Sequence, residues 1–266
     1  DGRLRTSYTT HVTSTGRLSS KEPNLQQISK GDDPKPWNDR VKKCFVPKPG
    51  FTLLSADYSQ LELRLAVAYA QEPELIKVFE EGRDIFDEMA AEMGWPRKKT
   101  KGFVYAVQYG AGDAQVARIF GVSLREAKKL REKFYHRYPR FRAVDESCRQ
   151  RVGATKSLKL WSGRVRHFQS KEDNYKAMNA LLQGGGADVV EKVWAYVMKH
   201  VDNEDCRTLL QVHDALVFEV KNEHVDHYRK IIEETMSDVN GICSPDPKNP
   251  LFPVKFAVDV TVWGED

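Results

Sequence analysis

The stretch Thr-Leu-Leu-Gln-Val-His-Asp-Ala-Leu-Val-Phe-Glu-Val, residues 208–220, decides the fold of this chain. Two apolar runs, 208–212 and 216–220, contain residues that favour strands and flank the dipeptide His213-Asp214. This pattern predicts a tight antiparallel hairpin with an aspartate at its turn. A carboxylate beside an apolar strand is costly to bury unless it is paired or bound to a metal, so Asp214 is a candidate functional residue.

A second aspartate follows a second apolar run. Residues 51–56, Phe-Thr-Leu-Leu-Ser-Ala, come after the turn signal Pro49-Gly50 and predict a strand that ends at Asp57. If the strands bring Asp57 and Asp214 together, the pair can hold Mg²⁺, because magnesium sites use one or two carboxylates plus substrate phosphates. The alternative is structural: Asp57 would cap the following helix, and Asp214 would be an ordinary turn residue.

Most of the remaining segments have a helical pattern. In the middle of the chain, helices are predicted from Leu61 to before Pro73, over 75–79, over 97–120 with an interruption at 109–112, and over 125–138. Later segments predict helices over 175–182 and 187–200 on either side of Gly184-Gly185-Gly186, an amphipathic helix over 223–239, and a half-buried strand over 254–262. Strands, a helical insertion and strands again predict an α+β fold.

Size and composition limit the possibilities further. A chain of 266 residues with 40% hydrophobic and 30% charged content can form one or two closely joined domains. The formal net charge of +4 permits a phosphate-rich partner without requiring one. The four cysteines lack zinc spacing, which indicates reduced thiols, and no apolar run approaches the length of a membrane span. We therefore expect a soluble, intracellular (cytoplasmic) protein.

A third group of residues recurs every four positions. Arg97, Lys101 and Tyr105 would share one face of a helix, and Tyr109 continues the series. Two cations beside an aromatic ring suit a triphosphate with its base and sugar. The alternative is a solvated basic helix, because Lys98 and Lys99 make this stretch cationic all round.

Taken together, these segments resemble family A DNA polymerases, the DNA polymerase I class. Residues 57–64, Asp-Tyr-Ser-Gln-Leu-Glu-Leu-Arg, resemble motif A; the series from Arg97 to Tyr109-Gly110 resembles motif B; and 211–214 resemble motif C. Residues 15–26 are similar to the family's template-primer contact segment, and Gln183-Gly184 to its Gln-Gly helix element. Three motifs in the family's order carry far less false-positive risk than one short motif.

The resemblance implies an architecture and a division of the chain. The fold would be α+β, a polymerase palm with an antiparallel β-sheet plus a helical fingers subdomain, with the thumb and exonuclease domains absent. Residues 1–62 would be the first part of the palm, 63–170 the fingers, and 171–266 the second part of the palm. A second chain or domain is expected to supply the thumb and proofreading.

The resemblance also implies roles for individual residues. The catalytic groups would be Asp57, Asp214 and Lys101, and the ligands of two Mg²⁺ ions would be Asp57, Asp214 and the Tyr58 carbonyl. The deoxynucleoside triphosphate would contact Arg97, Lys101, Tyr105, Glu62, Gln60 and Tyr58. Among these, Glu62 would be the steric gate that excludes a 2′-hydroxyl. The DNA primer-template would contact Arg17, Gln26, Tyr109, Gln183 and His213.

Two positions depart from the family's usual pattern. Ala215 stands where motif C commonly has a glutamate, and Phe86 stands where a phosphate-contacting histidine is common. Glu219 could replace the missing carboxylate, and its alternative interpretation is a solvent-facing strand residue.

The resemblance implies a template-directed DNA polymerase core that adds deoxynucleotides to a primer 3′-hydroxyl by two-metal-ion nucleotidyl transfer. The alternative is a catalytically weak polymerase-like module that binds nucleic acid or a replication partner. A single-subunit RNA polymerase is disfavoured by Glu62 and by the segment that contains Arg17.

Overall fold

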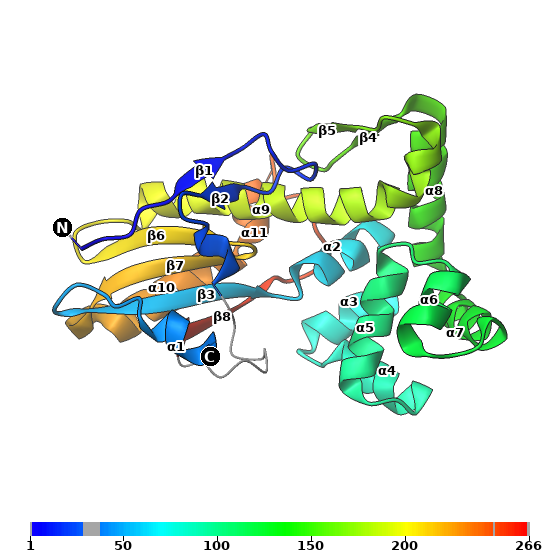
Figure 1. Ribbon diagram of the computed structural model, residues 1–266, viewed down its shortest axis with the longest axis horizontal. Coiled ribbons are helices and arrows are strands. Elements are labelled where there is room, and N and C mark those ends of the chain that lie inside the picture. Colours follow the sequence, from blue (N-terminus) through cyan, green and yellow to red (C-terminus); the bar gives the residue numbers. More distant parts are fainter. Residues whose placement is uncertain (1, 29–37, 247, 265–266) are drawn as a thin grey trace. The chain divides into compact units, whose positions relative to one another are not determined.

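The computed structural model describes residues 2–28, 38–246 and 248–264 (Figure 1). The chain forms two compact units. The sheet unit consists of Asp1–Leu61, Gly186–Leu251 and Phe256–Asp266, and the helical unit of Glu62–Gly185 and Phe252–Lys255. The division at Leu61/Glu62 lies next to the predicted palm boundary, whereas the division at Gly185/Gly186 comes later than the predicted 170/171. The exact bounds of palm and fingers stay a prediction.

Four antiparallel strands form the main sheet, in the order β6-β7-β3-β8 (Figure 1). Their bounds are β3, Phe51–Ser59; β6, Cys206–Val212; β7, Ala215–Lys221; and β8, Ala257–Val262. The predicted hairpin is confirmed, because β6 and β7 pair up to Val212 and Ala215 around the turn at 213–214. Two strand ends were predicted wrongly: β3 continues through Asp57 to Ser59, and β8 begins only at Ala257.

One face of the sheet is covered by α10 (Val225–Ser237), which contacts β3, β7 and β8. Leu54, Leu216 and Phe218 have no exposed surface, and burial of each such side chain contributes about 1.5–3 kcal/mol. Tyr58 belongs to this core: its ring is 6% exposed, and its Oη donates to the Met236 carbonyl at 2.7 Å. Burial raises the pKa of the Tyr58 hydroxyl well above its ordinary value.

Short elements complete the sheet unit. They are a hairpin of β1 (Ser7–Thr9) and β2 (Ser19–Lys21), the 3-10 helices η1 (Leu25–Gln27) and η3 (Asn222–His224), and the helices α1 (Asn38–Lys43) and α11 (Val239–Cys243). All four cysteines are in the thiol form in this structure.

The helical unit contains most of the predicted helices. Its helices are α2 (Leu61–Ala70, whose first residue belongs to the sheet unit), α3 (Pro73–Glu80), α4 (Ile85–Met93), α5 (Arg97–Gln108), α6 (Asp113–Phe120), α7 (Leu124–Arg137) and α8 (Pro139–Thr155). A small hairpin, β4 (Ser157–Lys159) with β5 (Val165–His167), and η2 (Lys171–Lys176) follow. The predicted interruption at 109–112 is confirmed. Pro139 ends α7 but also starts α8, which the sequence analysis missed; proline is well suited to a first helical position.

The fold as a whole is the predicted α+β arrangement with an antiparallel sheet and a helical portion. Within the described ranges, no helix combines the length and the apolar character that crossing a bilayer requires.

The prediction of two helices around Gly184-Gly185-Gly186 is wrong. Figure 1 shows α9 (Ala177–His200) as one continuous helix, and the three glycines are buried inside it. The Trp161 indole lies against Gly185 and donates from Nε1 to its carbonyl at 2.9 Å, while Arg164 Nη2 donates to the Gly184 carbonyl at 3.0 Å. These glycines therefore permit the close approach of an aromatic ring and do not break the helix.

We expect Gly185→Ala to lower the free energy of unfolding by about 1 kcal/mol through overpacking. A Cβ at Gly185 would lie 3.2 Å from the Trp161 ring. Gly102→Ala is the matched control, because Gly102 also lies inside a helix but its Cβ would meet Phe120 at an ordinary 3.5 Å. The free energy of unfolding of Gly102→Ala should rise by about 0.4–1 kcal/mol. Urea unfolding measures both values, and a shift of the same sign in both variants would contradict the packing explanation.

Candidate active site

Asp57 on strand β3 and Asp214 in the β6–β7 turn lie close together in the sheet unit. Asp57 stands opposite Ala215 in the β3–β7 ladder, and Asp214 directly precedes Ala215 in the hairpin turn. The Tyr58 N–H donates to the Asp214 carbonyl at 3.4 Å, which extends the ladder into the turn. Because Asp57 lies inside a strand and the next helix begins at Leu61, the interpretation of Asp57 as a helix cap is wrong.

The oxygen groups at this end of the sheet suit a hard cation. Two carboxylates and the Tyr58 carbonyl are the type of ligand that Mg²⁺ prefers, and the usual magnesium site adds substrate phosphates to one or two carboxylates. In the part of the chain that the structure describes, no three His, Cys, Asp or Glu side chains gather closely enough to hold a metal ion. The remaining ligands of a cation at Asp57 and Asp214 would therefore be water or substrate oxygens.

Arg17 provides a positive partner for Asp214. Arg17 Nη2 lies 3.0 Å from Asp214 Oδ1, and each side chain is 25% exposed. The loop between β1 and β2 carries Arg17 to this position. The Arg17 guanidinium therefore offsets the negative charge of Asp214 in this structure.

A buried hydrogen-bond network supports the turn that carries Asp214. The Tyr8 Oη donates to the Gln211 carbonyl at 2.8 Å and accepts from the Gln211 N–H at 2.9 Å. Gln211 Nε2 in turn donates to the His213 carbonyl. The His213 backbone has a φ of 56°, and its side chain is exposed. Sequence reasoning missed Tyr8, because a tyrosine in a three-residue strand carries no signal of function.

Gln26 belongs to the same network. Its side chain is 8% exposed, its Nε2 donates to Gln211 Oε1 at 2.9 Å and to the Gln211 carbonyl at 3.3 Å, and its Oε1 accepts from the Ser20 N–H. Both ends of the amide are therefore engaged inside the protein, an arrangement that does not favour the predicted contact of Gln26 with DNA.

In the helical unit, α5 carries three of the predicted nucleotide-binding residues, Arg97, Lys101 and Tyr105. Arg97 and Lys101 are exposed, and the Tyr105 and Tyr109 rings stack with centroids 6.1 Å apart. Arg97 forms ion pairs with Asp84 and with Asp87, the latter at 3.1 Å. Burial alone would raise the pKa of the Asp84 carboxyl, but hydrogen bonds from Arg97 and from the Phe86 N–H outweigh burial and lower it.

The Phe86 ring lies within cation–π distance of Arg97 and Lys101. It has no exposed surface, and its ring centroid lies 5.7 Å from the Arg97 guanidinium carbon and 5.7 Å from Lys101 Nζ. The Tyr105 ring lies 5.8 Å away. The position expected for a phosphate-contacting histidine thus holds an aromatic ring within cation–π range of both cations.

Glu62, the predicted steric gate, is 7% exposed in the first turn of α2 and accepts a hydrogen bond from Tyr109 Oη.

Gln183 is partly buried in α9. In the sheet unit, Gln60 has a φ of 56° between β3 and α2, and its buried Oε1 has no hydrogen-bond partner. The Tyr58 side chain is committed to the core, which leaves its backbone carbonyl as the group that could serve the site.

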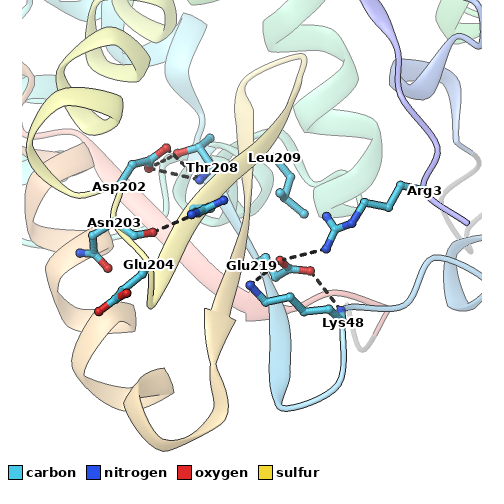
Figure 2. A pocket seen from close by; sticks show the side chains of 9 residues that line it. Arg3, Lys48, Asp202, Asn203, Glu204, Thr208, Leu209 and Glu219 are labelled. Atoms are coloured by element: carbon cyan, nitrogen blue, oxygen red, sulfur yellow. Dashed lines mark hydrogen bonds and ion pairs between the residues drawn. The ribbon is translucent and has the colours of Figure 1, made fainter. Parts of the chain in front are cut away.

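Glu219 is not the replacement for the missing motif C carboxylate. It stands opposite Leu53 in β3, four residues and about 13 Å along β7 from Ala215. Figure 2 shows its carboxylate between Lys48 and Arg3, at 3.6 and 3.7 Å. At 4% exposure it is buried, so the interpretation as a solvent-facing residue is also wrong. The pocket drawn there, of about 490 Å³, therefore lies apart from the Asp214 turn.

Comparisons with known proteins give the family of this chain. The family model described as DNA polymerase family A matches residues 1–262. The chain is 30% identical over 262 residues to the thermostable DNA polymerase I of Thermus aquaticus, covering 92% of this chain and 31% of the relative. It is 33% identical over 259 residues to DNA polymerase I of Rhizobium leguminosarum, covering 89% of this chain and 25% of the relative.

A solved structure is similar over nearly the whole chain. It is the POL domain of Pol1 from M. smegmatis in complex with DNA primer-template and dNTP, with a TM-score of 0.84 and 26% identity. The match covers 99% of this chain and 48% of that chain. This chain thus spans about a third or less of the curated relatives' length. On these matches, and on the three motifs in their order, the chain belongs to DNA polymerase family A.

Proposed function

We propose that this chain is the catalytic core of a template-directed DNA polymerase, which adds deoxynucleotides to a primer 3′-hydroxyl by two-metal-ion nucleotidyl transfer. The observation that carries the proposal is that Asp214 lies in the hairpin turn directly before Ala215, the residue that stands opposite Asp57 in the β3–β7 ladder. The cationic face of α5 and the primer-template and dNTP in the similar Pol1 structure support it.

The sheet unit would supply the metal ligands. Asp57, Asp214 and the Tyr58 carbonyl would hold two Mg²⁺ ions, which would supply activation of the primer hydroxyl and neutralisation of the leaving pyrophosphate. Arg17 would exchange its contact with Asp214 for the minor-groove edge of the primer-template, where every Watson–Crick pair presents an acceptor. Gln183, Tyr109 and His213 would add further contacts with DNA.

The helical unit would bind the nucleotide. Arg97 would hold the triphosphate, and Lys101 would donate a proton to the departing pyrophosphate. Arg97 would first leave Asp84 and Asp87; this costs little, because exposed ion pairs contribute about 0–1 kcal/mol. Glu62, held by Tyr109, would exclude a 2′-hydroxyl, with Tyr105 beside the base and Gln60 as a further contact. A second domain or chain would supply the thumb and proofreading.

A second candidate is a polymerase-like module that binds nucleic acid or a replication partner with weak catalysis. Ala215 and Phe86 favour it, because each removes a polar group from the family's usual site. Asp57 and Asp214 favour the catalytic proposal, because both carboxylate ligands are retained.

Asp57→Asn and Asp214→Asn should each reduce primer extension to background, because each removes a charged metal ligand. Asp259→Asn is the matched control: Asp259 stands directly opposite Asp57 in β8 and is exposed. It should retain most of the activity. Extension assays with a labelled primer and Mg²⁺ measure all three. Full activity in either motif variant would refute the catalytic proposal.

Ala215→Glu should make the chain depend more strongly on Mg²⁺ for stability. A glutamate there would stand opposite Asp57, and like charges at directly opposed positions destabilise a sheet, by roughly 0.2–1 kcal/mol. Without metal, the melting temperature should fall; with Mg²⁺, it should recover and activity should equal or exceed that of the parent. Ala215→Gln, which has the same shape without the charge, is the control and should show no metal-dependent recovery.

Glu62→Ala should increase ribonucleotide incorporation, because the small side chain makes room for a 2′-hydroxyl. Tyr109→Phe should give a smaller increase in the same direction, since it removes only the hydroxyl that holds the Glu62 carboxylate. The measurement is the ratio of kcat/KM for a deoxynucleotide and its ribonucleotide. An unchanged ratio in Glu62→Ala would place sugar selection elsewhere.

A further inference from the structure

The Tyr8 side chain forms hydrogen bonds with the backbone of β6, the edge strand of the main sheet. Among the strands that the structure describes, β6 has a neighbour only on its β7 side, so an edge residue such as Gln211 presents a backbone N–H and C=O without a ladder partner. The Tyr8 hydroxyl bonds to both of these groups. Its ring meets the Trp194 ring edge-on, with centroids 5.7 Å apart. Tyr8 is thus fixed at both its ring and its hydroxyl.

The Gln211 side chain continues this network toward the turn. Gln211 is 3% exposed, and its amide links Gln26 on one side to the His213 carbonyl on the other. His213 is in the left-handed region at φ 56°, which a residue other than glycine adopts only infrequently. A bond that anchors its carbonyl therefore stabilises a turn conformation that the local sequence does not favour by itself.

We propose that Tyr8 and Gln26 are positioning residues for Asp214. They fix Gln211, and Gln211 holds the turn in the conformation in which the Asp214 carboxylate can bind a divalent cation beside Asp57. Neither side chain would touch metal, nucleotide or primer. The inference rests on the proposed function and extends it to the first segment of the chain, which also carries Arg17.

Two substitutions remove these contacts with little change of shape. Tyr8→Phe deletes both hydroxyl bonds and keeps the ring on Trp194, while Gln26→Glu replaces the donor that faces Gln211 and leaves the acceptor for Ser20. Tyr228→Phe is the matched control, because its hydroxyl makes two hydrogen bonds to Asn203 in the same unit.

The test is Mn²⁺ binding to the whole chain without DNA, followed by calorimetry or electron paramagnetic resonance, with a thermal melt of each variant. Partners that orient a metal ligand typically change metal affinity by about 10–100-fold. We expect about 10-fold weaker binding in Tyr8→Phe and Gln26→Glu, and parental binding in Tyr228→Phe. In primer extension, the Mg²⁺ concentration for half-maximal rate should rise by a similar factor, while the nucleotide KM at saturating Mg²⁺ stays unchanged.

Asp214→Asn separates the two levels of the proposal. If it weakens Mn²⁺ binding but Tyr8→Phe and Gln26→Glu do not, the positioning role is overturned and the proposed function stands. If Asp214→Asn leaves binding unchanged, the metal assignment fails, and the positioning role fails with it. A further loss from Tyr8→Phe in the Asp214→Asn background would also overturn the inference, because the effect would then not act through Asp214.

Discussion

The register between β3 and β7 is the constraint on which the candidate site depends. Pairing runs from Phe51 opposite Lys221 to Asp57 opposite Ala215, and it brings the backbone of Tyr58 to Asp214. Alternate residues of β3 face α10, where the Tyr58 ring is buried. A slip by one residue would turn that ring toward the opposite face and carry Asp57 into the core. Apolar burial on one face therefore decides where the carboxylates lie, although no carboxylate contributes to that burial.

In each unit, a charged residue proposed to act on substrate already has an opposite charge beside it. Asp214 has Arg17 in the sheet unit, and Arg97 has Asp84 and Asp87 in the helical unit. Such pairs keep the charges oriented. Because they are partly exposed, exchange of a partner for a metal ion or a phosphate costs only about 1 kcal/mol or less. The ion pairs of Glu219 with Lys48 and Arg3 differ from these, because the Glu219 carboxylate is buried. A carboxylate held in this way stabilises the fold and could not move to the Asp214 turn.

Sequence patterns predicted the features that depend on local periodicity and failed where a tertiary contact decides. The β6–β7 hairpin and the break after α5 follow from apolar alternation and from glycine in a turn, so both could be predicted. The glycines of α9 have the same local signature as a break, and only the Trp161 indole on Gly185 explains why the helix continues. The family motifs located Asp57 and Asp214. Tyr8 could not be found in this way, because its proposed role depends on Gln211, which lies 203 residues further along the chain.

The presence of alanine at 215 can be explained by Asp259, the second cross-strand neighbour of Asp57. In the sheet, Asp57 stands between Ala215 of β7 and Asp259 of β8. Directly opposed residues of antiparallel strands project from the same face, and opposed like charges destabilise the pair. A glutamate at 215 would thus complete a row of three carboxylates across three strands, and a bound cation would offset their repulsion. With alanine at 215, the row contains only the carboxylates of Asp57 and Asp259, and Asp259 is exposed. The chain therefore has one negative charge fewer near the proposed metals. The repulsion between carboxylates is also weaker when no metal is bound. The departure at motif C is therefore compatible with a sheet that folds without metal and still presents two aspartates to it.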